Sequence, residues 1–185
     1  MPRLTGILNP SMGPLINPLY LPIGDGAPEV VNVVIEIPRH SSNKYELDPD
    51  LGVMRLDRVL YSPLFYPTDY GFIPSTKYLD GDPIDVLLLI SHPTLPGIVV
   101  DAKPVGVLEM RDQGDPDEKI LCVATKDPRF GTRQDLKDIN PHTLEEIQHF
   151  FEVYKTLEKK EVEILGWKGK DVALDIIRRF TIPQK

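Results

Sequence analysis

The sequence predicts an α+β domain in which a strand-rich barrel or curled sheet is followed by two C-terminal helices. The chain has 185 residues, of which 41% are hydrophobic, and this suits one globular domain with a sizeable core. Short segments rich in β-branched residues occupy the middle of the chain, and apolar residues at helical spacing appear only after residue 140. Strands first and helices last is an order typical of the α+β class.

The first 28 residues predict an irregular arm rather than a helix or a long strand. Prolines and glycines interrupt regular structure, and this stretch contains Pro2, Gly6, Pro10, Gly13, Pro14, Pro18, Pro22, Gly24, Gly26 and Pro28. We therefore expect an arm at residues 1–28, packed on the body or on a neighbouring subunit, and a single catalytic domain at residues 29–185.

The strands of the domain are predicted from short β-branched runs separated by turn residues. Typical turns are Leu95-Pro96-Gly97 and Gln113-Gly114-Asp115-Pro116. The predicted strands are Val30–Ile37, Lys44–Leu47, Val53–Leu60, Ile84–Ile90, Ile98–Ala102, Val105–Met110, Lys119–Ala124 and Val162–Leu165.

Two helices are predicted near the C-terminus. The first begins at a capping box formed by Thr143 and Glu146, and the second has Asp171 as its N-cap. Their inner faces are predicted from apolar residues at helical spacing, which are Leu144, Ile147, Phe150, Phe151, Tyr154 and Leu157 in the first, and Val172, Ile176, Ile177 and Phe180 in the second.

Charge and cysteine content limit the function. With 21 Lys and Arg against 28 Asp and Glu, the formal net charge is −7, which disfavours broad nucleic-acid binding. Cys122 is the only cysteine, so we expect a small buried thiol and a reducing compartment. We see no signal segment and no apolar run long enough to span a membrane, and we therefore expect a cytoplasmic protein with no nucleic-acid or membrane partner.

The most informative segment is Asp80-Gly81-Asp82-Pro83-Ile84-Asp85, which leads straight into a predicted buried strand. Carboxylates about 4 Å apart repel by roughly 4 kcal/mol at a surface-like dielectric. A cation relieves this repulsion, and oxygen ligands favour the hard ions Mg²⁺, Mn²⁺ or Ca²⁺ over zinc. Taken alone, such a segment is more often a solvated acidic turn, and only the rest of the chain favours a metal site.

Further acidic residues add to this inventory. Glu36 interrupts an apolar strand, which predicts partial burial and a partner for its carboxylate. Glu46 and Lys44 alternate along a strand, so their side chains share one face. A turn-like loop between two predicted strands adds Asp112, Asp115 and Asp117.

Several other sites are excluded by the sequence. An EF-hand starting at Asp80 needs glycine at its sixth position, where Asp85 stands. The histidines have no paired ligand spacing and there is one cysteine, which excludes an ordinary zinc site. Glycine-rich phosphate loops and a GxSxG element are absent.

Basic and phenolic side chains can complete a phosphate site, because they donate hydrogen bonds to phosphate oxygens. Each of them can also be structural, and Tyr66 with Tyr70 can form a simple aromatic corner. These donors are Arg58, Tyr66, Tyr70, Tyr154 and Lys155.

Segments carrying these residues occur in an order that resembles the soluble (family I) inorganic pyrophosphatases, over roughly residues 29–180. The DGDPxDV element that begins at Asp80 is highly specific. The others are residues 34–38, 43–46, 56–58, 65–71, 112–119 and 150–155. The resemblance implies a five-stranded, OB-like β-barrel with additional short strands and flanking helices.

The resemblance also implies the reaction and its residues. The reaction is hydrolysis of inorganic pyrophosphate to two phosphates with Mg²⁺, for which Mn²⁺ is a possible substitute, and the substrate enters as its magnesium complex. Asp82 would be the general base. Metal ligands would be Asp80, Asp85, Asp112, Asp117, Glu36 and Glu46. Phosphate would be bound by Lys44, Arg58, Tyr70, Lys119, Tyr154 and Lys155, with Tyr66 orienting a ligand. Bacterial members of this length are commonly homohexamers, so we expect a homo-oligomer.

Two other functions stay open at this level. Another Mg²⁺-dependent phosphohydrolase, acting on nucleotides or polyphosphate, would need a base-binding site, for which only Trp167 stands out. A non-catalytic OB-type nucleic-acid binder would need a basic groove and stacking aromatic residues, which the net charge of −7 disfavours.

Overall fold

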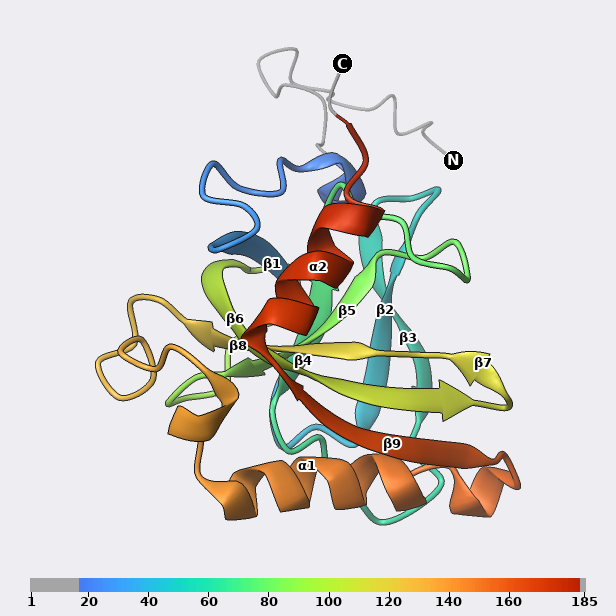
Figure 1. The fold of residues 1–185 in the computed structure, drawn as a ribbon. Helices are drawn as coiled ribbons and strands as arrows, with labels where there is room; N and C mark the ends of the chain where they lie inside the picture. Colours follow the sequence, from blue (N-terminus) through green and yellow to red (C-terminus); the bar gives the residue numbers. More distant parts are fainter. Residues whose placement is uncertain (1–16, 184–185) are drawn as a thin grey trace, which may run out of the picture.

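The computed structural model of the chain describes residues 17–183 and has the predicted order of strands followed by helices (Figure 1). The helices are α1 (Pro141–Val153) and α2 (Lys170–Phe180). The strands are β1 (Val31–Ile37), β2 (Asn43–Asp48), β3 (Val53–Val59), β4 (Asp69–Ile73), β5 (Ile84–Leu89), β6 (Val99–Asp112), β7 (Asp115–Pro116), β8 (Lys119–Ala124) and β9 (Val162–Gly169).

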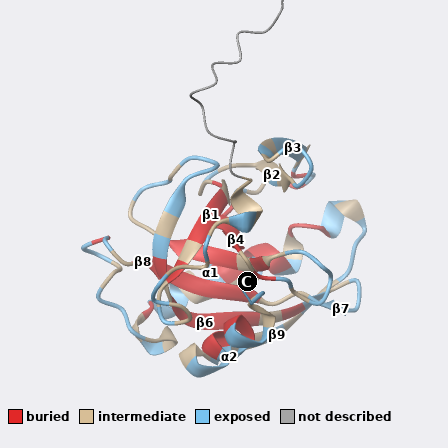
Figure 2. Cartoon of the chain, turned by 90° about the horizontal axis from the view of Figure 1, so that it is seen from above, coloured by how far each residue is buried: buried red, intermediate tan, exposed pale blue. Residues whose placement is uncertain are grey.

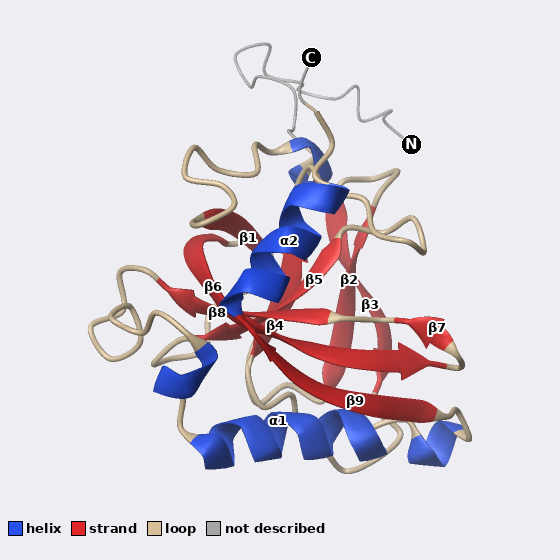
Figure 3. Cartoon of the chain, viewed as in Figure 1, coloured by secondary structure: helices blue, strands red, loops and turns tan. Residues whose placement is uncertain are grey.

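A ring of hydrogen-bonded strands forms the centre of the molecule. The pairing runs β1–β4–β5–β8–β6 and returns from β6 to β1, which closes a ring of five strands within a mixed sheet. Only β5 and β8 are parallel within this ring. The additional strands β7 and β9 pair with β6, and β2 and β3 form a separate hairpin (Figure 3).

The ring strands are buried on both faces, because alternate side chains enter two different cores (Figure 2). On β5, Leu87 and Leu89 face the core that includes residues of α1, whereas Val86 and Leu88 face the core beneath α2. Figure 1 shows α1 running beside β9 and α2 lying across the sheet. Cys122 is fully buried in the second core, as predicted for a small apolar thiol.

Two strand predictions were wrong. Strand β4, Asp69–Ile73, is absent from the predicted strands, and its Tyr70 is predicted only as a phosphate donor or as part of an aromatic corner with Tyr66. Its Gly71 is required by close packing, because a Cβ atom there would lie 2.0 Å from the carbonyl oxygen of Val34. The separate strands predicted at residues 98–102 and 105–110 are one strand, β6, which continues past Pro104 through an irregularity in its pairing with β8.

The predicted helix starts were also wrong. Helix α1 begins at Pro141 and is capped by Asn140, whose side chain accepts a hydrogen bond from the backbone of His142, so Thr143 lies inside the helix. Leu157 lies beyond α1 in a 3₁₀ turn and is exposed. The N-cap of α2 is Gly169, and Asp171 lies in the first turn of the helix. Its negative charge there interacts favourably with the positive end of the helix dipole.

The part of the arm that the structure describes, residues 17–28, contains one 3₁₀ turn, Pro18–Tyr20, and packs on the body. The carbonyl oxygen of Leu19 accepts a hydrogen bond from the Ser75 backbone, and that of Ile23 accepts one from Asn32. Residues 1–16 of the predicted arm lie outside the described residues. Within residues 17–183, no helix is long and apolar enough to cross a membrane.

Candidate active site

One cavity of about 1250 Å³ collects most of the predicted site residues. All of them except Arg58 and Tyr66 line it, and they come from all five of the ring strands, from β2 and from the segments that follow β4, β7 and α1. The lining members are Glu36, Lys44, Glu46, Tyr70, Asp80, Asp82, Asp85, Asp112, Asp117, Lys119, Tyr154 and Lys155. The fold therefore brings together residues that are far apart in the sequence.

A second cavity, of about 550 Å³, lies apart from these residues and contains none of them. Asp127 in its wall accepts hydrogen bonds from Ser91 and from the backbone of Arg129. Burial opposes ionisation of Asp127, but these hydrogen bonds lower its pKa to about 2. The carboxylate is held by its own loop and by Ser91, which follows β5, and this indicates a structural role.

The β1 and β2 strands supply one wall of the large cavity. The Oε1 atom of Glu36 accepts a hydrogen bond from the backbone nitrogen of Leu47 at 2.8 Å, which is the partner that burial of this carboxylate requires. Burial nevertheless raises the pKa of Glu36 to about 8. Lys44 and Glu46 form an ion pair on the same face of β2, as their spacing predicts.

Lys119 is the most buried charged group of the site. Its ammonium nitrogen lies 2.5 Å from Oδ2 of Asp85 and 2.5 Å from Oδ1 of Asp117. The parallel pairing of β5 with β8 explains this contact, because Val86 pairs with Ile120 and so the preceding residues lie side by side. Burial opposes the charge of Lys119, but the two carboxylates raise its pKa.

Lys155 makes a similar pair with Asp112. The ammonium of Lys155, which follows α1, donates to Oδ2 of Asp112 at the end of β6. The other oxygen, Oδ1 of Asp112, is buried and has no hydrogen-bond partner among the described residues. A buried carboxylate oxygen without a donor is costly, and it would be satisfied by a cation or a bound donor in the cavity.

The acidic turn after β4 presents Asp80 and Asp82 at the open side of the cavity. Oδ1 of Asp80 accepts a hydrogen bond from the backbone nitrogen of Asp82 at 3.0 Å, and Gly81 has a φ of 98°, which favours glycine. Burial, followed by the negative charges of Asp80 and Asp85, raises the pKa of Asp82. A carboxylate with a raised pKa is a stronger base.

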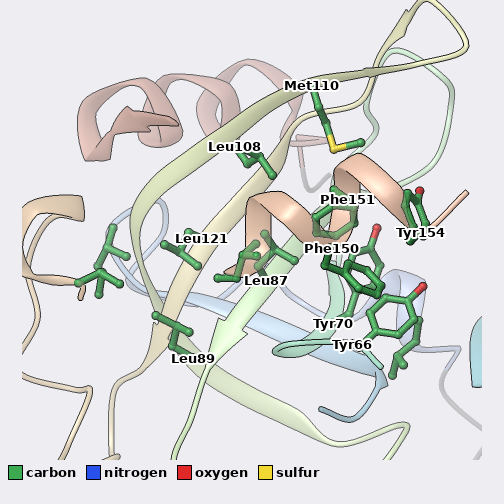
Figure 4. Close-up of a cluster of buried hydrophobic side chains, with 14 of the residues drawn as sticks. Tyr66, Tyr70, Leu87, Leu89, Leu108, Met110, Leu121, Phe150, Phe151 and Tyr154 are labelled. Atoms are coloured by element: carbon green, nitrogen blue, oxygen red, sulfur yellow. The ribbon is translucent and has the colours of Figure 1, made fainter. Parts of the chain in front are cut away.

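Tyr70 and Tyr154 line the site where it meets the core, and with Tyr66 they lie at one end of the cluster in Figure 4. Burial raises the pKa of Tyr70 and of Tyr154, and neighbouring acids, Asp85 and Asp117 among them, raise both further, so their hydroxyl groups stay protonated and can donate. Tyr66 lies behind them and is only 2% exposed. Its ring centroid lies 5.7 Å from that of Tyr70.

Arg58 lies on β3, opposite Lys44 on β2, and does not line the cavity. Its Nε donates to Oε1 of Glu158 at 3.2 Å and its terminal nitrogen to Oδ2 of Asp57 at 2.5 Å. The same Asp57 oxygen lies 3.6 Å from the ammonium of Lys44. Arg58 is therefore linked to the cavity through Asp57 and Lys44.

The donor chemistry of the cavity fits hard divalent cations. Its acids supply oxygen ligands only, and Oδ1 of Asp112 lacks a partner among residues 17–183. In the same part of the chain, no three acidic, histidine or cysteine side chains are close enough to hold an ion as they stand. Lysine ammonium groups lie against Asp85, Asp112 and Asp117 in this arrangement.

Sequence reasoning missed some residues around the cavity. Lys77 lines it beside the acidic turn, and Leu19 and Tyr20 of the arm line its edge. Asp57 and Glu158 hold Arg58, and Glu118 accepts a hydrogen bond from Tyr78. Of these residues, only Asp57 could have been identified from the sequence, because it is the neighbour of Arg58. The other contacts join segments that are distant along the chain.

Comparisons with known proteins identify the family of the chain. A family model described as "Inorganic pyrophosphatase" matches residues 33–182. The inorganic pyrophosphatase of Synechocystis sp. is 54% identical over 148 residues, covering 80% of this chain and 88% of that protein. The Thermus thermophilus enzyme is 52% identical over 161 residues, covering 85% and 92%.

Solved structures give the same result. The crystal structure of inorganic pyrophosphatase from Thermus thermophilus superposes with a TM-score of 0.87 at 50% identity, covering 90% of this chain and 97% of that one. The enzyme from Helicobacter pylori gives a TM-score of 0.83 at 41% identity, covering 87% and 96%. The chain therefore belongs to the family I inorganic pyrophosphatases.

Proposed function

We propose that this chain hydrolyses inorganic pyrophosphate to two orthophosphates in the large cavity, with Mg²⁺ held by the cavity carboxylates. The observation that carries the proposal is the lining of that cavity. It combines oxygen-only metal ligands with protonated donors for phosphate oxygens, in a chain that belongs to the inorganic pyrophosphatase family.

Magnesium dependence is a property of this family. Asp80, Asp85 and Asp117 are the proposed ligands of one ion, and Asp112 with Asp117 those of an ion that arrives with the substrate. Glu36 and Glu46 would lie around these ions in the outer ligand shell. Divalent cations, when bound, lower the pKa of water and neutralise charge on a phosphoryl group, and Mn²⁺ offers the same oxygen-ligand chemistry.

Asp82 is the proposed general base. It lies on the acidic turn that borders the cavity, and it has no ammonium partner within ion-pair distance among the described residues. Burial, Asp80 and Asp85 raise its pKa, so it accepts a proton from the attacking water more readily than an ordinary aspartate. The proton leaves the water as its oxygen bonds to phosphorus, and the P–O–P bond breaks to release phosphate.

The donors bind and orient the two phosphate groups. Lys44, Lys119 and Lys155 supply ammonium groups inside an acidic cavity, which would otherwise repel a polyanion. Tyr70 and Tyr154 supply hydroxyl groups that stay protonated because burial raises the pKa of both. Arg58 would reach a phosphate oxygen by releasing one of its two carboxylate partners, and Tyr66 would keep Tyr70 in place by ring packing.

The remaining expectations are proposals too. Residues 29–185 would form the catalytic domain, and the five-strand ring would close as the OB-like barrel. We also propose a cytoplasmic homo-oligomer, with a hexamer favoured. Exposed apolar side chains on and after β3, which are typical of a contact surface, support association: Leu56, Val59, Tyr61 and Phe65. Light scattering of the purified protein measures the subunit number.

Phosphate release tests the proposed function. The purified chain should release phosphate from pyrophosphate with Mg²⁺, also with Mn²⁺ as a substitute, and not with excess EDTA. ATP and tripolyphosphate should be poor substrates under the same conditions. Faster release from ATP or tripolyphosphate would identify another phosphohydrolase instead, and a gel shift with single-stranded nucleic acid at low salt but no phosphate release would identify a binding protein.

A further inference from the structure

Two loops that carry proposed metal ligands meet at the cavity. One is the turn after β4, which carries Asp80 and Asp82, and the other is the segment before β8, which carries Asp117. Both loops are acidic, so their charges repel one another. Lys119 pairs with Asp117, whereas Asp80 and Asp82 have no ion-pair partner among the described residues, so a direct contact between the loops would help to fix their spacing when no cation is bound.

Tyr78 is built into the first loop by its backbone. Its N–H donates to the carbonyl oxygen of Asp82 at 2.6 Å, and its carbonyl oxygen accepts from the N–H of Gly81 at 3.1 Å. These two hydrogen bonds close the turn that presents Asp80 and Asp82. A displacement of the Tyr78 backbone therefore displaces Asp82.

The side chain of Tyr78 connects that turn to the second loop. Its ring packs on Phe180 at the end of α2, with the ring centroids 4.6 Å apart. This packing fixes the orientation of the Tyr78 side chain. Its hydroxyl donates to Oε2 of Glu118. Glu118 lies between Asp117 and Lys119, and these two residues form an ion pair with each other.

We propose that the Tyr78–Glu118 hydrogen bond is a positioning contact that sets the spacing between Asp82 and Asp117. Neither side chain lines the cavity, so neither touches the substrate, and the contact acts through the carboxylates on either side of it. The inference rests on the proposed function, because it assigns a role in the same metal-dependent site.

Tyr78→Phe tests the inference, since it keeps the ring packing and removes only the hydroxyl. Manganese binding to the substrate-free protein, measured by calorimetry, should weaken about 3- to 10-fold, the effect of one hydrogen bond. The kcat for pyrophosphate at fixed Mg²⁺ should fall by a similar factor, with KM changed less. Tyr61→Phe is the matched control, because this tyrosine is 64% exposed and the change keeps the apolar ring that the proposed contact surface would use.

Substitutions of the partner complete the test. Glu118→Gln keeps an acceptor oxygen and should bind Mn²⁺ within about twofold of the wild type, whereas Glu118→Ala should match Tyr78→Phe. The double variant Tyr78→Phe/Glu118→Ala should lose no more than either single variant, because both remove one contact. A purely structural role would lower the melting temperature and leave Mn²⁺ binding unchanged, and that result overturns the inference.

The inference and the proposed function fail in different ways. If the wild type hydrolyses pyrophosphate and Tyr78→Phe binds Mn²⁺ as tightly as the wild type, only the positioning role is refuted. If the wild type releases no phosphate from pyrophosphate while Tyr78→Phe weakens Mn²⁺ binding, the contact positions a metal site but the proposed reaction is wrong.

Discussion

Replacing Lys119 by methionine would test whether the acids of the site depend on an internal cation. The side chain of Lys119 is only 4% exposed, and it neutralises Asp85 and Asp117, which are 29% and 20% exposed. Methionine has a similar length and no charge. The variant Lys119→Met therefore leaves two neighbouring carboxylates in a poorly solvated cavity without a counter-charge.

The expected loss of stability follows from this burial. Removing one partner of a buried ion pair costs about 3–5 kcal/mol, and the partial exposure of both acids places this case near the lower value, about 3 kcal/mol. With a urea dependence of about 2 kcal/mol per molar, the unfolding midpoint should fall by roughly 1.5 M. This is a large part of the stability of a typical domain.

Urea unfolding with EDTA, followed by circular dichroism, measures this shift. Repeating it with Mg²⁺ should narrow the difference between the wild type and Lys119→Met, because a bound cation replaces part of the lost charge. Lys126→Met is the control, since the Lys126–Asp101 pair is at the surface and should matter little. Equal midpoints of the wild type and Lys119→Met in EDTA would refute the reasoning.

Further predictions concern the proposed base Asp82, Arg58, and the loss of stability at acid pH through Asp127. Asp82→Asn should keep Mn²⁺ binding and lower turnover by about 10²–10⁴, and unchanged steady-state turnover would remove Asp82 as the base. Arg58→Lys should lower kcat/KM about tenfold, because one ammonium cannot replace a guanidinium that holds Asp57 and Glu158 through different nitrogens; wild-type kinetics would make Arg58 structural. Asp127→Asn should lower the melting temperature at pH 7 by roughly 2–6 °C. The pKa of Asp127 is lowered from 3.8 to about 2 in the folded chain, so its contribution is present above pH 3.8 and is lost as the pH falls toward 2. Melting curves at pH 7 and pH 3 should show the gap between wild type and variant closing, and a constant gap would contradict this sign.

Much of the fold was predictable because most of its strands are short β-branched runs bounded by turn residues. Strand β4 was not, since Gly71 weakens the strand pattern, and the need for glycine arises only from the nearby backbone of Val34. The break predicted inside β6 failed for a related reason. Pro104 interrupts a local pattern, but a sheet can accommodate it at an irregular position in the pairing.

The members of the candidate site were predictable as residue types, and their contacts were not. The spacing of Lys44 and Glu46 alone places them on one face of a strand, and the resulting ion pair confirms it. Nothing in the local sequence indicates that Arg58 contacts Glu158, which lies 100 positions away. Propensity and periodicity act over a few residues, whereas such pairs form through the packing of whole elements.

Three features follow from the order of the residues alone: strands before helices, the acidic turn from Asp80 to Asp85, and the family to which the chain belongs. These are properties of local spacing and of residue identity. The tertiary structure decided which charges neutralise one another, how burial raises the pKa of Glu36, and that Tyr78 reaches Glu118 across 40 positions. The physical reason is that desolvation and ion pairing depend on distances in space, which exist only once the ring of strands has closed.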